Sequence, residues 1–268
     1  MTRAAHPTQG TRKIKTKNTP VGKHNMRNNA KILTLASLIL MPLSAEAYQV
    51  APMVYDMAPS GNKATTVIRI TNTQDQPITV EMQAEQRLFD EAGKESRKPA
   101  DDRFVLFPPQ AIVQPGATQA VRVQYVGPQT LDRSETYTVT VKQVPVQLPS
   151  DGKTGVQFVF NFSTVANIVP SGAKAQLAAP SEPLSLSPDG KTLRLTLRNT
   201  GTKYANLSRS SVELAGGAYR TTVKDEEWRK ALGTSWILPG GTRVIELPKP
   251  DKAPAQLTAT FKFVEPQN

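Results

Sequence analysis

Three of the eight phenylalanines of the chain stand at alternate positions within five residues, at Phe158, Phe160 and Phe162. We call these three residues the phenylalanine row, and Val156 precedes them in the same alternation. Alternate side chains of a β-strand point to one side, so residues 156–168 predict a long strand with an aromatic face. The chemistry open to such a face is apolar burial. It could fill the core of its own domain, or it could enter a partner that accepts an added strand.

The residue types that most often perform catalysis or hold zinc are nearly absent. Both histidines, His6 and His24, lie within the first 47 residues, and the chain has no cysteine. If residues 1–47 are removed, Ser-His-Asp and Cys-His catalysis, His or Cys zinc sites and disulfides are all excluded. Asp101 and Asp102 could imitate a pair of calcium ligands, but no EF-hand spacing surrounds them. We therefore predict a protein that is not an enzyme and holds neither a metal nor a cofactor.

The first 47 residues have the pattern of a cleavable secretory signal. Basic residues precede a 12-residue apolar core, Ile32–Leu43, and Ala45-Glu46-Ala47 offers a small-residue cleavage site. Met26 is an alternative start and would leave a signal of ordinary length. The apolar core is short for a membrane span, so we expect no stable membrane insertion, with an uncleaved anchor as the rival interpretation.

Removal of this segment changes the charge argument. It carries eight Lys or Arg and one Glu, so the remaining chain has 25 basic and 21 acidic residues, and the net charge falls from +11 to +4. Most of the net positive charge therefore lies in the targeting segment, and the charge of the remaining chain no longer argues for nucleic-acid binding. The small positive charge that remains could still steer an acidic partner.

Short alternating runs between Gly- and Pro-containing turns fill the rest of the chain and predict an all-β fold. A single short helix is expected over 224–232. We predict two immunoglobulin-like β-sandwich domains, over 48–169 and 170–268. Besides the long strand, the expected strands are 48–55, 65–73, 78–88, 104–107, 118–125 and 136–144, then 184–186, 192–199, 205–214, 218–223, 235–238, 243–247 and 256–265.

Two local patterns recur in both halves. Asn72 and Asn199 each follow an alternating strand and open a turn. A Pro-Gly pair follows 43 residues later in the first half, at Pro115, and 40 residues later in the second, at Pro239. Proline fixes φ and glycine accepts positive φ, so both pairs predict tight turns. The repetition indicates two domains of related topology.

The segment from Phe107 through Pro108-Pro109 to Pro115-Gly116, followed by Val121-Arg122-Val123, carries a resemblance to a known family. Together with 137–145 (YTVTVKQVP) and the long strand ending before Pro170, it resembles the periplasmic chaperones of the chaperone–usher pilus pathway. The absence of cysteine and the shape of the long strand are similar to the archaic branch.

The resemblance implies two immunoglobulin-like domains in a boomerang arrangement, located in the periplasm. It implies binding of pilin subunits by donation of the last strand of the first domain, and delivery to an outer-membrane usher. The subunit-binding residues would be Val156, Phe158, Phe160 and Phe162. Val159 and Val165, on the other face, would pack on the chaperone's own core. Because an exposed aromatic row favours aggregation, the free protein is expected to hide it by self-association or by a folded-back loop.

One departure from the family concerns the anchor of the pilin's terminal carboxylate. Many members use an arginine in the first strand and a lysine late in the donated strand. Here those positions fall near Asp56 and on Val165, and neither is basic. Lys142 and Arg122 are the candidate substitutes.

Two further interpretations remain open from the sequence. One is an exported immunoglobulin-like adhesin or structural fimbrial component, in which the phenylalanine row is ordinary core. The other is a secreted hydrolase that uses paired carboxylates, which needs no histidine.

Overall fold

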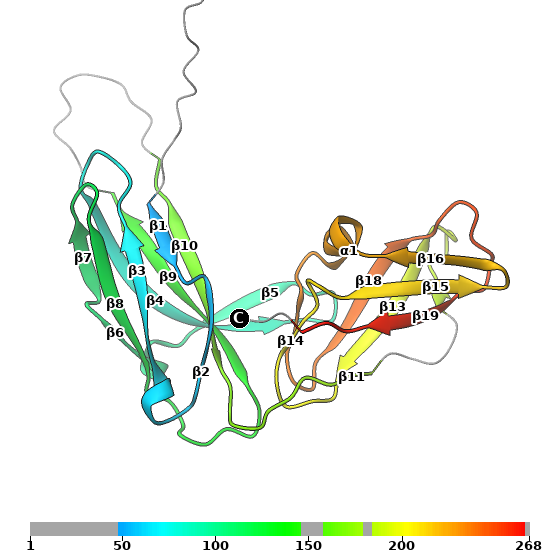
Figure 1. The fold of residues 1–268 in the computed structure, drawn as a ribbon, viewed down its shortest axis with the longest axis horizontal. Helices are drawn as coiled ribbons and strands as arrows, with labels where there is room; N and C mark the ends of the chain where they lie inside the picture. The colour runs from blue at the N-terminus through cyan, green and yellow to red at the C-terminus, as the bar shows by residue number, and fades with distance from the viewer. Residues whose placement is uncertain (1–47, 146–157, 179–183, 266–268) are drawn as a thin grey trace, which may run out of the picture. The chain divides into compact units, whose positions relative to one another are not determined.

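The computed structural model describes residues 48–145, 158–178 and 184–265 (Figure 1), so the predicted signal peptide and Val156 lie outside the described residues. Two separate hydrophobic cores are present. The first gathers buried side chains from Tyr48 to Ile168, and the second gathers those from Leu184 to Leu257. The predicted class, all-β with two immunoglobulin-like sandwiches, is confirmed. In the described part of the chain, no helix is long and apolar enough to cross a membrane.

The first sandwich consists of two sheets that enclose the first core. One sheet has the order β1-β3-β8-β6, and the other has the order β2-β10-β9-β4-β5 with β7 beside β4. Short 3-10 helices occupy Asn62–Ala64 and Asp101–Arg103. The strands are β1 Gln49–Ala51, β2 Val54–Met57, β3 Thr65–Thr71, β4 Ile78–Phe89, β5 Glu95–Pro99, β6 Phe104–Phe107, β7 Gln110–Val113, β8 Thr118–Tyr125, β9 Glu135–Val144 and β10 Asn161–Ile168.

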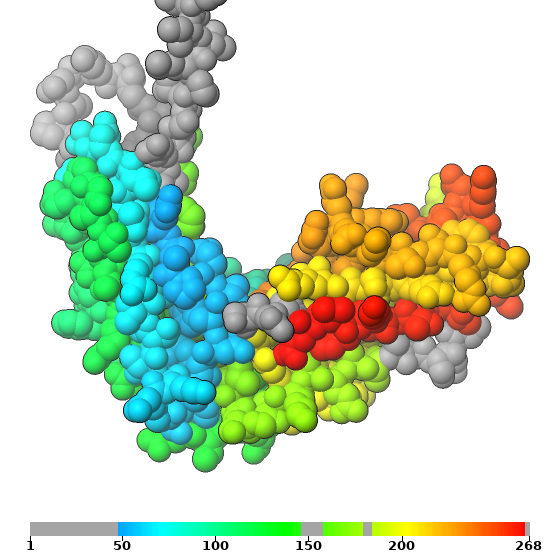
Figure 2. Space-filling view, viewed as in Figure 1, coloured from blue at the N-terminus to red at the C-terminus, as the bar shows by residue number. Residues whose placement is uncertain are grey.

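The N-terminal segment crosses from one sheet to the other. The sequence predicts a single strand over 48–55, but the structure splits it into β1, which pairs with β3, and β2, which pairs in parallel with β10. The break falls at Pro52, which follows a cis peptide bond and has no N–H for a ladder. Figure 2 shows this segment, in blue, on the surface of the first sandwich beside β3.

The second sandwich is built from shorter strands around its own core. Its helix, α1 Asp225–Leu232, lies where the sequence predicts one, and it buries Trp228, whose indole Nε1 donates to the Leu207 carbonyl at 2.8 Å. The strands are β11 Leu177–Ala178, β12 Ser185–Leu186, β13 Thr192–Asn199, β14 Ala205–Asn206, β15 Ser211–Gly216, β16 Tyr219–Val223, β17 Trp236–Ile237, β18 Thr242–Pro248 and β19 Thr258–Lys262.

The repeated Asn and Pro-Gly patterns form the same structure in both sandwiches. Gly116 and Gly240 have φ values of 70° and 78°, as the Pro-Gly turns require. Their backbone N–H groups donate to the carbonyls of Asn72 and Asn199, at 2.9 and 2.8 Å. Both asparagines are fully buried, and each amide group bonds two backbone carbonyls. The predicted relation between the two halves is therefore structural: each half has its own buried asparagine, which links two turns by hydrogen bonds.

Candidate functional site

The inward face of β10 passes gradually out of the core of its own domain. Ile168, Ala166 and Thr164 are fully buried, and Phe162 and Phe160 are half-buried against the core. Phe158, two residues further, is 66% exposed. One continuous apolar face therefore begins inside the sandwich and ends outside it.

The predicted strand is longer than the observed one. Residues 158–160 are described but are not in a strand, and β10 begins at Asn161. The physical reason is the loss of a partner. The ladder with β9 starts at Asn161, opposite Lys142, and the Gln143 N–H makes one further bond to the Phe160 carbonyl at 3.2 Å. β9 itself ends at Val144, two residues past Lys142, so before Val159 the described residues provide no neighbouring strand, and a strand without a ladder is not stable alone.

The expectation for the other face of the strand is wrong. Val159 and Val165 do not form part of the core, because Val159 is 43% exposed and Val165 is half-buried outside the core cluster. The strict two-residue period explains the error. Since Ala166 and Ile168 point into the core, Phe162 of β10 points the same way, and Phe160, just before the strand, also packs against the core. Phe162 and Phe160 thus extend the core face, and Phe158 follows them outside it.

One edge of β10 is open beside this face. The antiparallel ladder with β9 covers Asn161–Ile168, whereas the parallel ladder with β2 covers only Val165–Ile168. Because the chain leaves this sheet at Pro52, the described residues pair no strand with the β2 side of 161–164, although β1 of the other sheet lies nearby. An unpaired strand edge next to exposed apolar side chains is a template for an added strand.

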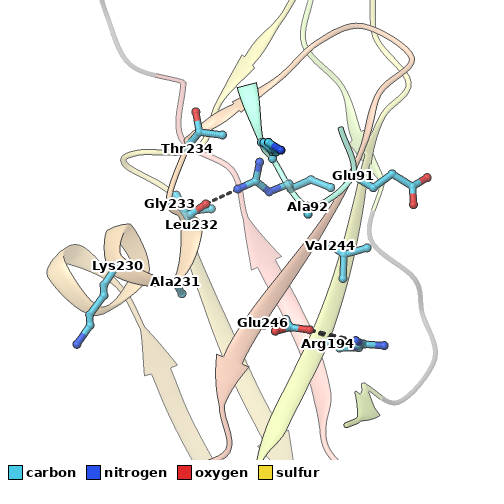
Figure 3. Close-up of a pocket in the computed structure, with 13 residues that line it drawn as sticks. Glu91, Ala92, Arg194, Lys230, Ala231, Leu232, Gly233, Thr234, Val244 and Glu246 are labelled. Atoms are coloured by element: carbon cyan, nitrogen blue, oxygen red, sulfur yellow. Dashed lines mark hydrogen bonds and ion pairs between the residues drawn. The ribbon is translucent and has the colours of Figure 1, made fainter. Parts of the chain in front are cut away.

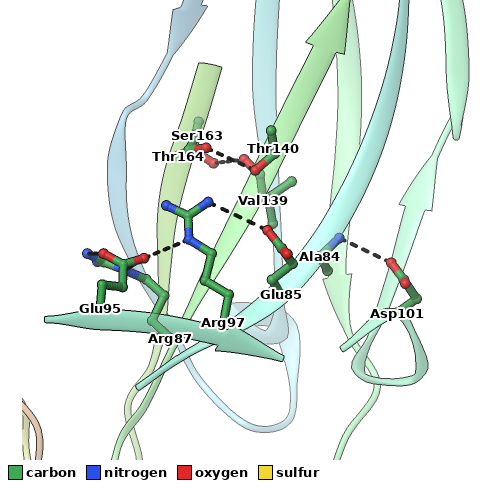
Figure 4. Close-up of polar contacts among 10 residues, drawn as sticks. All are labelled: Ala84, Glu85, Arg87, Glu95, Arg97, Asp101, Val139, Thr140, Ser163 and Thr164. Carbon is green, nitrogen blue, oxygen red and sulfur yellow. Dashed lines mark hydrogen bonds and ion pairs between the residues drawn. The ribbon is translucent and has the colours of Figure 1, made fainter. Parts of the chain in front are cut away.

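Polar side chains within the stretch 161–164 bond β10 to its neighbouring strands (Figure 4). Thr164 Oγ1 donates to the Val139 carbonyl at 3.0 Å, and the hydroxyls of Thr140 and Ser163 lie 3.0 Å apart. Tyr55, from β2, places its hydroxyl 3.2 Å from Thr164 Oγ1. Burial raises the pKa of Tyr55 to about 12, although the Thr164 bond opposes this shift, so its hydroxyl stays protonated at neutral pH.

Sequence reasoning missed Tyr48 at this site. Tyr48 is 1% exposed and precedes β1, in the sheet opposite β10. Its hydroxyl lies 2.8 Å from the Val141 carbonyl oxygen and 3.0 Å from the Phe160 carbonyl oxygen, so its single hydrogen is shared between these two acceptors. Its ring also meets that of Phe162 edge to face, with 4.7 Å between centroids. The signal that could have identified it is alternation with Val50, which points both side chains inward.

The two candidate carboxylate anchors are not brought together. Lys142 is in β9, half-buried and opposite Asn161, on the sheet face away from the core. Arg122 is in β8 of the other sheet, exposed between Val67 and Phe107. A single clamp made of both residues is therefore excluded by the topology.

Asp56, near the family's arginine position, is occupied by internal partners. Its Oδ1 accepts from Asn167 Nδ2 at 3.0 Å and from the Tyr204 hydroxyl at 2.7 Å. Lys203 Nζ lies 3.5 Å from its Oδ2. An acidic side chain held in this way would repel a terminal carboxylate rather than bind it.

A cluster of charges stabilises the β4–β5 hairpin (Figure 4). Glu95 accepts from Arg87 and from Arg97, each at 2.7 Å, and Arg97 also lies 3.5 Å from Glu85. Burial opposes ionisation of Glu95, but hydrogen bonds and charge from Arg87 and Arg97 outweigh it and hold its pKa below the ordinary value. These cations are neutralised within the hairpin and serve its structure.

A pocket of about 710 Å³, drawn in Figure 3, tests the hydrolase interpretation. Its acidic lining consists of Glu91 and Glu246, and Glu246 is paired with Arg194 at 3.2 Å. Four cationic side chains also line it, and Arg194 already engages one of the two carboxylates, so the pocket does not resemble the paired-carboxylate site of a hydrolase. Within the described ranges, no group of three or more His, Cys, Asp or Glu residues could hold a metal ion.

The fold and the site define a class of protein. It has two β-sandwiches, and the apolar face of the last strand of the first sandwich continues beyond that sandwich's core. Residues 57–172 match the family described as pili and flagellar-assembly chaperones, PapD N-terminal domain. The match covers most of the first sandwich, and over these residues the chain is similar to pilus-assembly chaperones.

Solved structures agree with the fold. The class 5 fimbriae chaperone CfaA is 14% identical, with a TM-score of 0.52 over 81% of this chain and 100% of that one. A chain from a chaperone–tip adhesin complex of CFA/I fimbriae is 12% identical, with a TM-score of 0.51 over 81% and 99%. A chain from the CsuC–CsuE complex of archaic Csu pili of Acinetobacter baumannii is 15% identical, with a TM-score of 0.49 over 74% and 89%. No curated protein matches the sequence.

Proposed function

We propose that this protein is a periplasmic pilus-assembly chaperone that stabilises pilin subunits by donating β10 and the residues before it. The observation that carries the proposal is the burial gradient along one face, from fully buried Ile168 to exposed Phe158. A subunit that lacks one strand would continue the chaperone's core beyond Phe160. The likeness of CfaA, a fimbrial chaperone, supports this interpretation at the level of the fold.

The open edge and the phenylalanine row would contribute different parts of the binding. Backbone bonds to the edge over 161–164 give affinity with little demand on sequence, whereas alternate side chains set register. Burial of one phenylalanine contributes roughly 1.5–3 kcal/mol before ordering costs are subtracted. Two or three such residues would contribute roughly 3–9 kcal/mol before those costs, so the backbone bonds at the open edge must supply part of the affinity.

The wider setting follows from the same proposal. A signal peptide over 1–47 would export the chain, and an outer-membrane usher would receive the loaded chaperone. The chaperone role needs no catalytic group and no cofactor. The lack of cysteine in the sequence favours the archaic branch of the family.

Of the two candidate anchors for the subunit's carboxylate, the geometry supports Lys142. It lies beside Asn161 at the start of β10, on the same outer face of the sheet as Val165, the family's lysine position. Arg122 belongs to the sheet that does not contain β10.

The test uses a matched pair of substitutions in adjacent exposed residues. Phe158→Asp changes the row, and Val159→Asp changes its neighbour on the opposite face, with both side chains largely exposed in the free protein. The full chain would be tagged at its C-terminus, purified from the periplasm, and any bound subunit identified by mass spectrometry. We expect the native chain and the Val159→Asp variant to retain a small β-protein one to one, and Phe158→Asp to lose it.

Circular dichroism separates loss of binding from loss of fold. Since Phe158 is outside the core, its substitution should leave the spectrum and the melting temperature unchanged. Phe160→Asp is a poorer choice, because Phe160 packs against the core. Retention of the subunit by Phe158→Asp, or no subunit bound by the native chain, would refute the proposal.

A further inference from the structure

Tyr48 stands where the sandwich's own core ends. Its side chain extends from the β1 side across the sandwich to backbone carbonyls of the opposite sheet. One of these, Val141 O, belongs to β9, and the other, Phe160 O, immediately precedes β10. Burial raises the pKa of Tyr48 to about 12, so its hydroxyl remains a donor at neutral pH.

The Tyr48 ring fills the place next to Phe162. The two rings meet edge to face at 71°, a favourable arrangement of aromatic quadrupoles. Phe162 therefore already has a partner within its own domain. Phe158, in contrast, is 66% exposed, and Phe160 lies between the two.

The backbone of Phe160 is held from two sides. Its N–H donates to Gln143 Oε1 at 3.2 Å, and its carbonyl accepts from both the Gln143 N–H and the Tyr48 hydroxyl. Phe160 is thus the first residue of the segment whose backbone is fixed before the ladder begins at Asn161. Removal of the hydroxyl would loosen this point and the adjoining start of the ladder at Val141, and would leave the two Gln143 bonds of Phe160 in place.

We infer that Tyr48 is a positioning residue that fixes the boundary between the part of the strand that completes its own sandwich and the part that is donated. This inference rests on the proposed function. The Tyr48 ring packs against Phe162, and its hydroxyl holds the Phe160 carbonyl. The core of a bound subunit would therefore begin at Phe160 and continue to Phe158. Phe162 then belongs to the chaperone's side of the boundary. The result is a single register for the bound subunit.

The experiment compares Tyr48→Phe with Tyr55→Phe in the full chain. Both tyrosines are buried, both reach β10 or its start with a hydroxyl, and both substitutions keep the ring. Only the Tyr48 hydroxyl contacts the backbone of Phe160. The readouts are amide hydrogen exchange of residues 158–162 in the free protein and the half-life of the complex with the co-purified subunit.

We expect Tyr48→Phe to raise amide exchange at 160–162 and to shorten the half-life of the complex by about fivefold each, as loss of one hydrogen bond predicts. Tyr55→Phe should leave both within about twofold, even if the two variants melt at similarly lowered temperatures. Equal effects of the two substitutions, or none from Tyr48→Phe, overturn the inference. If the native chain retains no subunit, the proposed function fails and the inference fails with it.

Discussion

Asn72 shows how much one buried side chain can hold in place. Its Nδ2 donates to the carbonyls of Gln76 and Val113 at 2.8 and 2.9 Å, and its Oδ1 accepts from the Gln74 N–H at 3.0 Å. Asn72→Ala would leave the buried Val113 carbonyl without this donor. We expect a loss of about 2–4 kcal/mol in the free energy of unfolding, because an unsatisfied buried group costs more than the bond itself contributes.

Urea denaturation would measure this loss, with Thr118→Ala as the control. Thr118 shares an exposed hydroxyl bond of 2.9 Å with Thr71, so its removal should cost less than about 1 kcal/mol. An Asn72→Ala variant as stable as the control would contradict the role given to the asparagine.

At the scale of residues, the sequence predicted which side chains matter better than it predicted which way they point. The phenylalanine row and the Pro-Gly turns could be read from spacing alone. The face of β10 that meets the core could not, because both faces carry apolar residues and period-two alternation does not say which one is inside. Ala166 and Ile168, which decide the matter, are less conspicuous than Val159 and Val165. Alternation with Val50 could have shown that Tyr48 is buried, but its hydrogen-bond partners are backbone carbonyls, which no side-chain pattern reveals.

The β4–β5 hairpin has a pH dependence that can be worked out. The pKa of Glu95 is lower in the folded state than its ordinary value of 4.5. A depressed carboxyl pKa stabilises the fold above the unfolded value, and that contribution is lost as the pH falls through the folded value. We expect the free energy of unfolding to fall on account of this group as the pH drops below 4.5, by no more than about 1 kcal/mol, the size of a partly exposed ion pair.

Glu95→Gln should remove that part of the pH dependence and lower the stability at pH 7 by a similar amount, measured by urea denaturation across the pH range. Glu246→Gln is the matched control. Its ion pair with Arg194 is exposed on both sides, so screening by water makes its loss nearly neutral. Parallel pH curves for the native chain and Glu95→Gln would disprove the assignment.

At the scale of elements, long alternating runs were predicted well and short or interrupted ones were not. β8 and β13 have the predicted bounds because each alternates cleanly between turn residues, and the short β6 has them because it is an apolar run, FVLF, between polar neighbours and a proline pair. β5 was missed because its residues, ESRKP, are charged or small and its stability comes from the ladder with β4 and from Arg87. The start of β10 depends on where β9 and β2 cease to pair with it, which is a property of the sheet that no local pattern contains.

The free protein exposes an aromatic side chain just before the start of β10. Phe158 is 66% exposed beside an open strand edge, and such a combination favours association of two copies through their edges. We expect sedimentation of the purified chain to show a concentration-dependent dimer. Phe158→Asp should shift it to monomer, because two carboxylates would meet at a symmetric contact.

Ile112→Asp provides the control for this last prediction. Ile112 is 65% exposed, almost the same as Phe158, but it lies in β7, away from the β10 edge. If exposure of any large apolar side chain drove association, both substitutions would produce monomer. If the donated strand itself is responsible, only Phe158→Asp will do so, and the addition of a subunit that occupies the strand will dissolve the dimer of the native chain. A dimer that persists in Phe158→Asp would show that this end of the strand does not mediate self-association.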